Sequence, residues 1–511
     1  MDINGAEIGT DEWLLKGLVE SLTAGWERLE KLGTYREGLP SVVALAQEEV
    51  KQAYERVANR SRLNVQELAV STKTSRLEVL GFRTGSSSSV NGDDEAWRIW
   101  KNSNMPLQSR NSFTGTGHLG ETFILVEWPQ ELTEDGLLVD SSGDEMTPIF
   151  HVLNGWTCAV RFSALRPGKV EYAIVASYDD FHQREWVTLY GIGWSRRAYR
   201  DGERTRPEEG VVSGWTLNDE WEWLEERQVS KAPTKCQVFS HHTESFQGIY
   251  EPHLDTVDRI NDGILQRVTI ALMQAFRQRA VKTGELDAVY PEDHPNAGEE
   301  IDYNSIFATG PAAMWLLPGD ADIWESSPTD IGPLTEAEKH DIQHFAAVTS
   351  TPLYALQPDA LEGSAAGAAV ARETLVFAVR TLATYAEDAF ASAMACAFEM
   401  MGDEARSDPA SIELIWRPVT QFSLAEAADA ALKAKQSGKS DRFVNERIWG
   451  MTPQEIKLEE EAVTRAGLFN TGAQVEGAGQ QGAQSVGNFQ EVPKQIQKPF
   501  SQQSALPGGV A

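Results

Sequence analysis

The sequence predicts an α+β protein, and three patterns support this fold class. Strand and turn patterns dominate residues 120–245, a near-heptad apolar pattern indicates a long helix over residues 255–282, and an Ala-rich helical pattern covers residues 368–401. The chain has 511 residues, of which 41% are hydrophobic and 24% charged. It is therefore long enough to bury a sizeable core and to divide into several domains.

Residues 1–62 are expected to begin helical. Large apolar residues recur there at helical intervals, namely Trp13, Leu14, Leu18, Leu22, Trp26 and Leu29. Residues 63–250 are expected to form a mixed α+β unit: a stretch at 60–68 leads to an apolar segment at 76–83, and a helix at 95–104 precedes a Gly-containing turn and a strand at 120–126.

Residues 251–283 predict the first of two charged helices. If residues 255–282 are fully helical, this helix is roughly 42 Å long at about 1.5 Å per residue. Its apolar positions are Val257, Ile260, Ile264, Val268, Leu272, Ala275 and Phe276. Its basic residues are Arg267, Arg277, Arg279 and Lys282. Such an amphipathic column suits packing beside copies of itself.

Residues 284–332 form an acidic segment without Lys or Arg. The eleven acidic residues are Glu285, Asp287, Glu292, Asp293, Glu299, Glu300, Asp302, Asp320, Asp322, Glu325 and Asp330. Residues 333–350 then predict a second helix, because Thr335 and Glu338 have the spacing of a capping box.

Small side chains dominate the end of residues 351–367, which allows close approach of neighbouring backbones. A long helix is expected at 368–403, followed over residues 404–466 by a strand at 412–418 and further helices. Ser423 and Glu426 form a second predicted capping box, and Thr452 is the expected N-cap of the last helix. Residues 467–511 are rich in Gly, Gln, Ser and Pro, a composition typical of disorder.

This order of elements resembles that of the portal proteins of tailed bacteriophages, of the siphophage type, over about residues 10–466. The segments at 60–68 and 76–83, the helix at 95–104, and the C-terminal strand with its Ala-rich helix carry the resemblance. The resemblance implies a wing (1–250), two stem helices (251–283 and 333–350), a clip (284–332), a tunnel loop (351–367), a long wing helix (368–403) and a helical crown with its strand (404–466).

A portal protein is a ring, dodecameric in this family, at one capsid vertex, through which double-stranded DNA is packaged and ejected. The resemblance therefore implies a virion protein assembled in the host cytoplasm, with no catalytic residue, metal or cofactor and no membrane contact. Implied partners are the major capsid and scaffolding proteins, the terminase large subunit and the head-tail connector or adaptor.

The resemblance also assigns residues to the channel. The tunnel loop would contain Leu356, Gln357, Glu362, Gly363, Ser364, Ala365, Ala366 and Gly367. The clip would dock partners through Glu299, Glu300, Asp302, Asp320 and Asp322. The basic residues of the stem would be Arg267, Arg277, Arg279 and Lys282.

Charge and cysteine content agree with a cytoplasmic DNA conduit. A net charge of −31 argues against a nonspecific DNA binder, which would need Lys and Arg to displace counterions from phosphates. The three cysteines are odd in number and far apart, which favours a reducing compartment. The start of the chain lacks the basic and apolar regions of a signal peptide, and no segment is apolar enough for a membrane span.

Several motifs imitate active sites. Residues 115–120 match GxGxxG, but a strand follows where a nucleotide site needs a helix, so a turn is expected. Residues 438–440 imitate the end of a phosphate loop, yet Lys433 occupies the place of its first Gly. Cys236, His241, His242 and His253 lack finger-like spacing for a metal. Trp215, Trp221 and Trp223 fit either a carbohydrate platform or a surface hairpin.

An alternative function remains open from the sequence: an acidic, soluble, metal-dependent hydrolase. Its site would use His340 and His344, which lie one helical turn apart, or Asp320 and Asp322. A mass measurement separates the two hypotheses, because a ring is many times heavier than 56.4 kDa.

Overall fold

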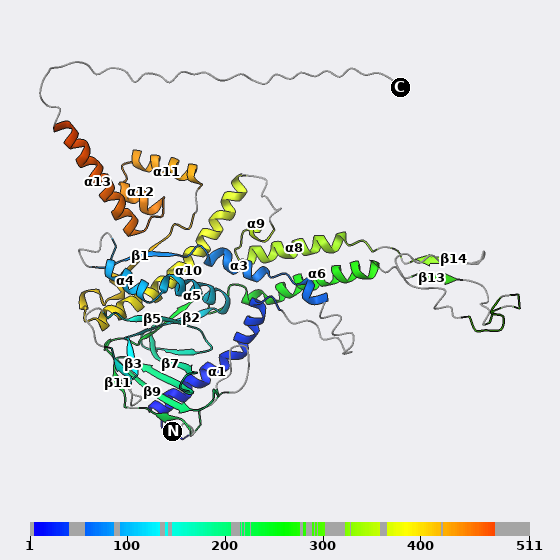
Figure 1. The fold of residues 1–511 in the computed structure, drawn as a ribbon, viewed down its shortest axis with the longest axis horizontal. Coiled ribbons are helices and arrows are strands. Elements are labelled where there is room, and N and C mark those ends of the chain that lie inside the picture. The colour runs from blue at the N-terminus through cyan, green and yellow to red at the C-terminus, as the bar shows by residue number, and fades with distance from the viewer. Residues whose placement is uncertain are drawn as a thin grey trace, which may run out of the picture. The chain divides into compact units, whose positions relative to one another are not determined.

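The computed structural model forms two compact units, Met1–Gln454 and Glu455–Ala511. It describes residues 5–39, 57–85, 92–132, 138–141, 146–205, 215, 217–218, 220–224, 226–275, 279–282, 289–290, 292–293, 295–301, 322–325, 327, 329–357, 365–420 and 423–475 (Figure 1). Helices and antiparallel sheets are both present in the first unit, which confirms the α+β class.

The N-terminal helix α1 (Asp11–Arg36) covers one face of a large antiparallel sheet. Its first turn is capped by Thr10, whose side chain accepts a hydrogen bond from Trp13 N. Its apolar face, including Trp26, packs with Ile174 and Leu189 from the sheet. The sheet has the order β10-β9-β8-β7-β6, with β11 also paired to β9. Its strands are β6 (Cys158–Phe162), β7 (Val170–Asp179), β8 (Arg184–Gly191), β9 (Trp194–Asp201), β10 (Glu222–Trp223) and β11 (Gln228–Val229).

A second, three-stranded sheet lies against the other face of the large sheet. It has the order β12-β2-β5 and comprises β2 (Glu121–Glu127), β5 (Ile149–Leu153) and β12 (Val238–His242). Side chains alternate along β2, so that Phe123 and Leu125 pack against Cys158 and Tyr190 of the large sheet. Ile124 faces the opposite way, toward the helical layer.

That helical layer completes the core of the first unit. It contains α3 (Val65–Thr74), α4 (Asp94–Asn102), α5 (Met105–Leu119) and α10 (Ala365–Met400). Aromatic rings join the helices edge to face: Phe390 of α10 lies 5.2 Å from Trp100 and 5.7 Å from Phe113, measured between ring centroids.

Further elements follow in the described part of the chain. Strand β1 (Val79–Arg83) pairs with β15 (Glu413–Trp416), which joins two segments more than 300 residues apart in sequence. Strands β3 (Gln130–Leu132) and β4 (Leu138–Asp140) form a hairpin. The described residues also contain the helices α6 (Leu254–Ala275), α8 (Gly332–Val348), α9 (Leu353–Leu356), α11 (Leu424–Gln436) and α12 (Asp441–Arg447), and α13 (Pro453–Val475), most of which belongs to the second unit. Short 3-10 turns cover Glu251–His253, Glu404–Arg406 and Pro409–Ser411.

The turn expected at residues 115–120 is largely helical. Residues 115–119 are the last turn of α5, a helix that the sequence analysis did not predict, and the chain turns only at Gly120. Gly120 has φ +86°, and a Cβ there would lie 2.4 Å from the carbonyl oxygen of Phe246. Only glycine fits this corner between α5 and β2.

The expectation of an exposed tryptophan cluster was wrong. Trp215 and Trp221 are buried in the core beside α1, where Trp215 packs against Trp26 with ring centroids 6.2 Å apart. Trp223 is half-buried and donates its indole N–H to Glu12. These rings serve packing, because Trp215 lies against Trp26 and Trp221, and the guanidinium of Arg196 lies 4.1 Å from the centroid of the Trp223 ring.

Candidate channel elements

The helix α6 starts from a firmly held base on α1. Arg28 binds both carboxylate oxygens of Glu251, at 2.7 and 2.6 Å, and the hydroxyl of Tyr35 lies 2.8 and 2.7 Å from the two oxygens of Asp258. Burial raises the pKa of Tyr35 and also that of Asp258. The backbone N–H of Leu63 donates to the side chain of Asn261. The first two turns of α6 are thus fixed to the α1 and α3 region.

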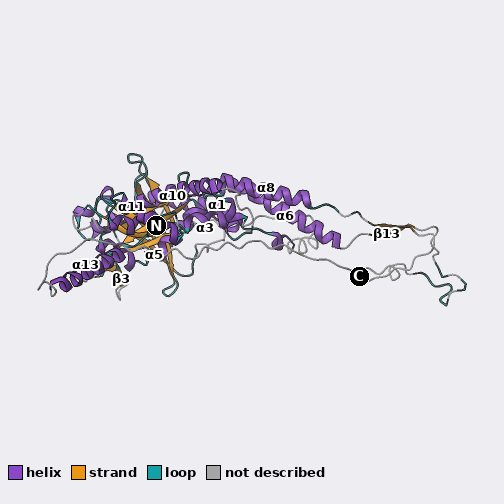
Figure 2. Ribbon diagram, turned by 90° about the horizontal axis from the view of Figure 1, so that it is seen from above, coloured by secondary structure: helices purple, strands orange, loops and turns teal. Residues whose placement is uncertain are grey.

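Helices α6 and α8 run side by side in opposite directions (Figures 1 and 2). Arg259 of α6 binds Asp341 of α8 at 2.9 Å. Arg267 lies later in α6, and it binds Glu338, which lies earlier in α8, at 3.0 Å. Because the partner positions descend as the α6 positions ascend, the pair is antiparallel. Ile264 of α6 belongs to the same buried cluster as Phe345 of α8.

The first charged helix is shorter than the sequence predicted. It ends at Ala275 after 22 residues, about 33 Å, and residues 279–282 form a strand instead. This strand, β13 (Arg279–Lys282), pairs antiparallel with β14 (Asp322–Glu325), so Arg279 lies in register with Glu325 and Lys282 with Asp322. The helical prediction failed because the strand pairs with residues about 40 positions away. Arg267 lies in α6 as expected, whereas Arg277 lies outside the described residues.

The acidic segment between the strands is described only in part. A short turn closes with Val289 bridged to Glu300, and Tyr290 N donates to Glu299 O at 2.9 Å. Glu299 and Glu300 are both exposed on it. Asp302 and Asp320 lie outside the described residues. Within the described part, the predicted docking carboxylates of Glu299 and Glu300 therefore point to solvent.

Helix α8 begins earlier than its predicted capping box. Its first residue is Gly332, with Pro333 in the first turn. The hydroxyl of Thr335 donates a hydrogen bond to Ile331 O, whereas the predicted capping box required it to accept one from the backbone N–H of Glu338. Glu338 is instead engaged by Arg267. The N–H groups of the first helical turn have no acceptor within the helix, so proline, which lacks an N–H, suits that turn. The helix therefore starts at Gly332 without the capping box.

A buried lysine of α3 holds the segment that follows α8. Lys73 is 2% exposed, and its ammonium group donates to Ala69 O at 2.8 Å and to the hydroxyl of Thr351 at 2.9 Å. Burial lowers the pKa of Lys73 to about 8. The sequence does not predict this role for Lys73, because no nearby residue distinguishes it from a surface lysine on a helix.

Part of the segment predicted to be the tunnel loop, residues 351–367, is helical. Leu356 ends the short helix α9 and Gln357 follows it, while Ala365, Ala366 and Gly367 already belong to α10. Residues 362–364 lie outside the described residues. The small side chains that suggested a loop are compatible with a helix, since Ala has the highest helix propensity of all residues.

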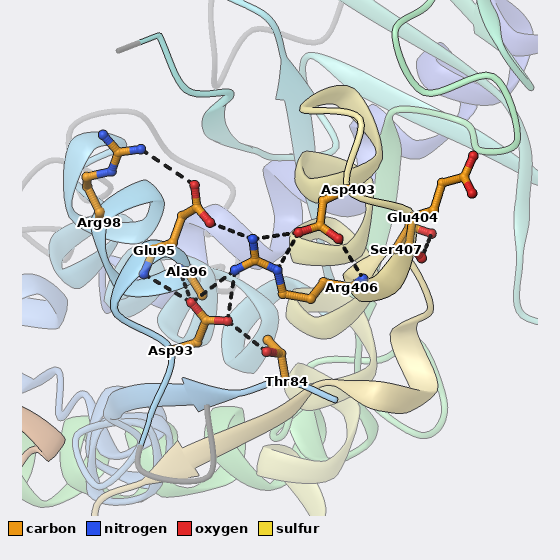
Figure 3. Close-up of polar contacts among 9 residues, drawn as sticks. All are labelled: Thr84, Asp93, Glu95, Ala96, Arg98, Asp403, Glu404, Arg406 and Ser407. Carbon is orange, nitrogen blue, oxygen red and sulfur yellow. Dashed lines mark hydrogen bonds and ion pairs between the residues drawn. The ribbon is translucent and has the colours of Figure 1, made fainter. Parts of the chain in front are cut away.

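An arginine-centred cluster fixes the C-terminal end of α10 to α4 and β1 (Figure 3). Arg406 lies 2.5 Å from Glu95, 2.6 Å from Asp403 and 3.1 Å from Asp93. Burial raises the pKa of Asp93, but hydrogen bonds from Ala96 N, Thr84 and Arg406 outweigh it and lower the pKa overall. Asp93 is also the N-cap of α4.

His340 and His344, one of the two pairs proposed for a hydrolase, form no metal site in the described part of the chain, while Asp320 of the other pair lies outside it. His340 and His344 are both exposed on α8, and His340 faces Glu336 at 3.5 Å. Cys236 and His241 are buried, and the Nδ1 of His241 lies 2.8 Å from the hydroxyl of Ser112. Among the described residues, no three His, Cys, Asp or Glu side chains gather closely enough to hold a metal ion. No described helix is both long and apolar enough to span a membrane.

Comparisons with known proteins give distant structural similarities. No protein-family model matches the chain, and no curated protein matches it. Among solved structures, the chain is similar to one from the neck of an empty gene transfer agent particle computed with C6 symmetry, with TM-score 0.38 and 13% identity, covering 76% of this chain and 87% of that chain. It is also similar to a chain from the virion of a native gene transfer agent particle, with TM-score 0.36 and 12% identity, covering 80% and 94%.

Proposed function

We propose that this chain is a portal protein, the subunit of a ring through which double-stranded DNA enters and leaves a phage-like capsid. The observation that carries the proposal is the hairpin formed by α6, β13, β14 and α8, which reverses direction through an acidic segment. Two antiparallel helices joined by ion pairs make a rigid column, and a ring of such columns makes a channel wall.

In this proposal α6 and α8 are the stem, and the acidic segment with β13 and β14 is the clip. The layered sheets and α10 form the wing, α11 and α12 belong to the crown, and the tunnel loop lies within residues 351–367. The terminase large subunit and later the head-tail connector dock at the clip. Scaffolding and major capsid proteins contact the ring from the head side.

The acidic clip has a physical role in this proposal. Carboxylates repel DNA phosphates over a range of about 8–10 Å at physiological salt, so they act only on a duplex inside a narrow channel. They prevent the DNA from sticking, and they offer acidic groups to basic surfaces of docking partners.

The mass of the purified chain tests the proposal. Native mass spectrometry or electron microscopy at micromolar concentration and moderate salt should show closed rings of many 56.4 kDa copies. A preparation that contains only monomers and dimers would contradict the proposal. It would favour the alternative function, a metal-dependent hydrolase of ordinary size.

Charge reversal tests the clip separately. Replacing both Glu299 and Glu300 by Lys should leave the rings intact but slow DNA passage or weaken connector docking, with a defect that shrinks as salt rises. The matched control is replacement by Gln, which removes charge without reversing it and should give a smaller defect. Normal packaging and ejection at low salt in the Lys variant would show that these carboxylates are only a solvated surface.

A further inference from the structure

The chain turns between α8 and α9 at a strained residue. Ser350 has φ +52°, a left-handed conformation that glycine adopts easily and serine adopts rarely. The backbone N–H of Ser350 donates to Ala347 O at 3.2 Å, and that of Thr351 donates to Ala346 O at 2.8 Å. These two hydrogen bonds form a Schellman motif, in which the position of Ser350 is usually glycine. The corner after α8 therefore carries backbone strain and depends on the contacts that surround it.

Lys73 begins a series of hydrogen bonds through this corner. Its ammonium group donates to the hydroxyl of Thr351 at 2.9 Å. The hydroxyl of Thr349 donates its only hydrogen to Phe345 O at 2.7 Å, so it is the acceptor in its 2.9 Å contact with the Thr351 hydroxyl. The series thus runs in one direction, from Lys73 through the two hydroxyls to the last turn of α8. Hydrogen bonds in such a series polarise and strengthen one another.

The position of Thr351 is held at a cost to the whole fold. Lys73 is 2% exposed, and both of its acceptors, Ala69 O and the Thr351 hydroxyl, are uncharged. Burial lowers the pKa of Lys73 to about 8, which still leaves the amine mostly protonated at pH 7. A buried charge without a counter-charge is unfavourable. An apolar side chain of similar length would avoid this cost, but it would leave Thr351 without its donor.

The corner sets the direction of the segment that follows it. Pro352 is extended, and α9 begins directly after it. Leu353 and Leu356 of α9 pack against the buried cluster that contains Phe345. A rotation of the backbone at Ser350 would move α9 away from this cluster, so the path of the chain after α8 depends on the corner.

We propose that Lys73 is a positioning residue, whose hydrogen bond to Thr351 holds the strained corner at Ser350 and so directs the chain into residues 351–367. The inference rests on the proposed function in one respect: it takes the tunnel loop to lie within these residues. In the ring, Lys73 of each subunit sets the direction of that subunit's tunnel loop relative to its stem.

Hydrogen exchange of the purified chain separates positioning from stability. Lys73→Met removes the donor to Thr351, so the amides within residues 349–357 should exchange about tenfold faster at pH 7, as expected for a lost hydrogen bond from a charged group. The same change removes a buried charge, so the slowest amides of β7 and β8 should exchange at the wild-type rate or more slowly. A lysine that only supported the fold would shift both sets of amides in the same direction, and that result would overturn the inference.

Thr351→Val tests the partner of Lys73. Valine accepts no hydrogen bond, so the amides within residues 349–357 should exchange faster by a similar factor. Combined with Lys73→Met, the local effect should not add, because either change alone breaks the same hydrogen bond; additive effects would exclude that bond. Thr335→Val is the matched control. Its hydroxyl donates to Ile331 O at the other end of α8, so this variant should leave residues 349–357 unchanged.

Relief of the strain provides a rescue. Ser350→Gly places at the left-handed position the residue that adopts it without strain. In the Lys73→Met background, this change should return the exchange of residues 349–357 most of the way to the wild-type rate. If the double variant exchanges as fast as Lys73→Met alone, Lys73 does not oppose strain at Ser350 and the inference is wrong.

The outcomes separate this inference from the proposed function. If the wild type forms rings but Lys73→Met leaves the exchange of residues 349–357 unchanged, the inference is wrong and the portal proposal stands. If the wild type forms no rings while the corner loosens as expected, the portal proposal is wrong and the role of Lys73 at the corner stands. Rings of the Lys73→Met variant should fill several-fold fewer capsids with DNA. Normal filling despite a loosened corner would overturn the link to the tunnel loop.

Discussion

Replacement of Lys73 by Met should stabilise the protein at neutral pH. Lys73 is buried without a carboxylate among its hydrogen-bond acceptors, which are Ala69 O and the hydroxyl of Thr351. Burial lowers its pKa from 10.5 to about 8. A difference of about 2.5 pKa units corresponds to roughly 3 kcal/mol of cost for keeping the ammonium charged in the folded state.

The sign of the pH dependence follows from the direction of this pKa change. Between pH 8 and 10.5 the unfolded chain binds more protons at Lys73 than the folded chain does, so this residue makes the wild type more stable as pH rises. Met carries no charge and should remove this dependence. The stability gained by Lys73→Met is therefore largest below pH 8 and decreases toward zero by about pH 10.5.

Thermal unfolding followed by circular dichroism measures the effect. A unit of about 450 residues has an unfolding entropy near 1 kcal/mol per degree, so a gain of about 3 kcal/mol raises Tm by about 3 °C. The difference between variant and wild type is the quantity to follow, because burial also raises the pKa values of Cys158, Cys236 and Cys396, and these thiols change the stability of both proteins in the same way.

A matched control uses a lysine that is not buried. Lys339 is exposed on α8, so Lys339→Met should leave Tm nearly unchanged at every pH in this range. If Lys73→Met instead lowers Tm at pH 7 by an amount that stays constant up to pH 10.5, the two hydrogen bonds outweigh the cost of burial and the reasoning is refuted.

Three further substitutions test contacts that hold the elements in place. Arg406→Met should lower the free energy of unfolding by about 3 kcal/mol or more, because it leaves the buried carboxylate of Asp93 without its cation; a loss below 1 kcal/mol by urea titration would contradict this. Gly120→Ala should lower Tm strongly, because its methyl group meets the Phe246 carbonyl, and an unchanged Tm would disprove the close approach. Arg267→Glu should destabilise the α6–α8 pair, and adding Glu338→Arg should restore stability; additive losses would exclude a direct ion pair.

The sequence by itself determined those elements whose signals lie within a few residues of one another. The capping box of Ser423 and Glu426 is present at the start of α11, with both hydrogen bonds formed. The apolar positions of α1 and of the first part of α6 lie on buried faces, as their spacing predicted. Periodicity and capping are local, because each depends on contacts three or four positions along the chain.

Tertiary structure decided the rest, because the deciding partner lies far away in sequence. Residues 279–282 have a helix-compatible pattern but become a strand through pairing with residues 322–325. Trp215 is buried because α1, almost 200 residues earlier, covers it. Lys73 and Arg406 acquire their roles from Thr351 and Asp93. Burial and pairing across such separations are properties of the packed chain, so no local pattern of residues can report them.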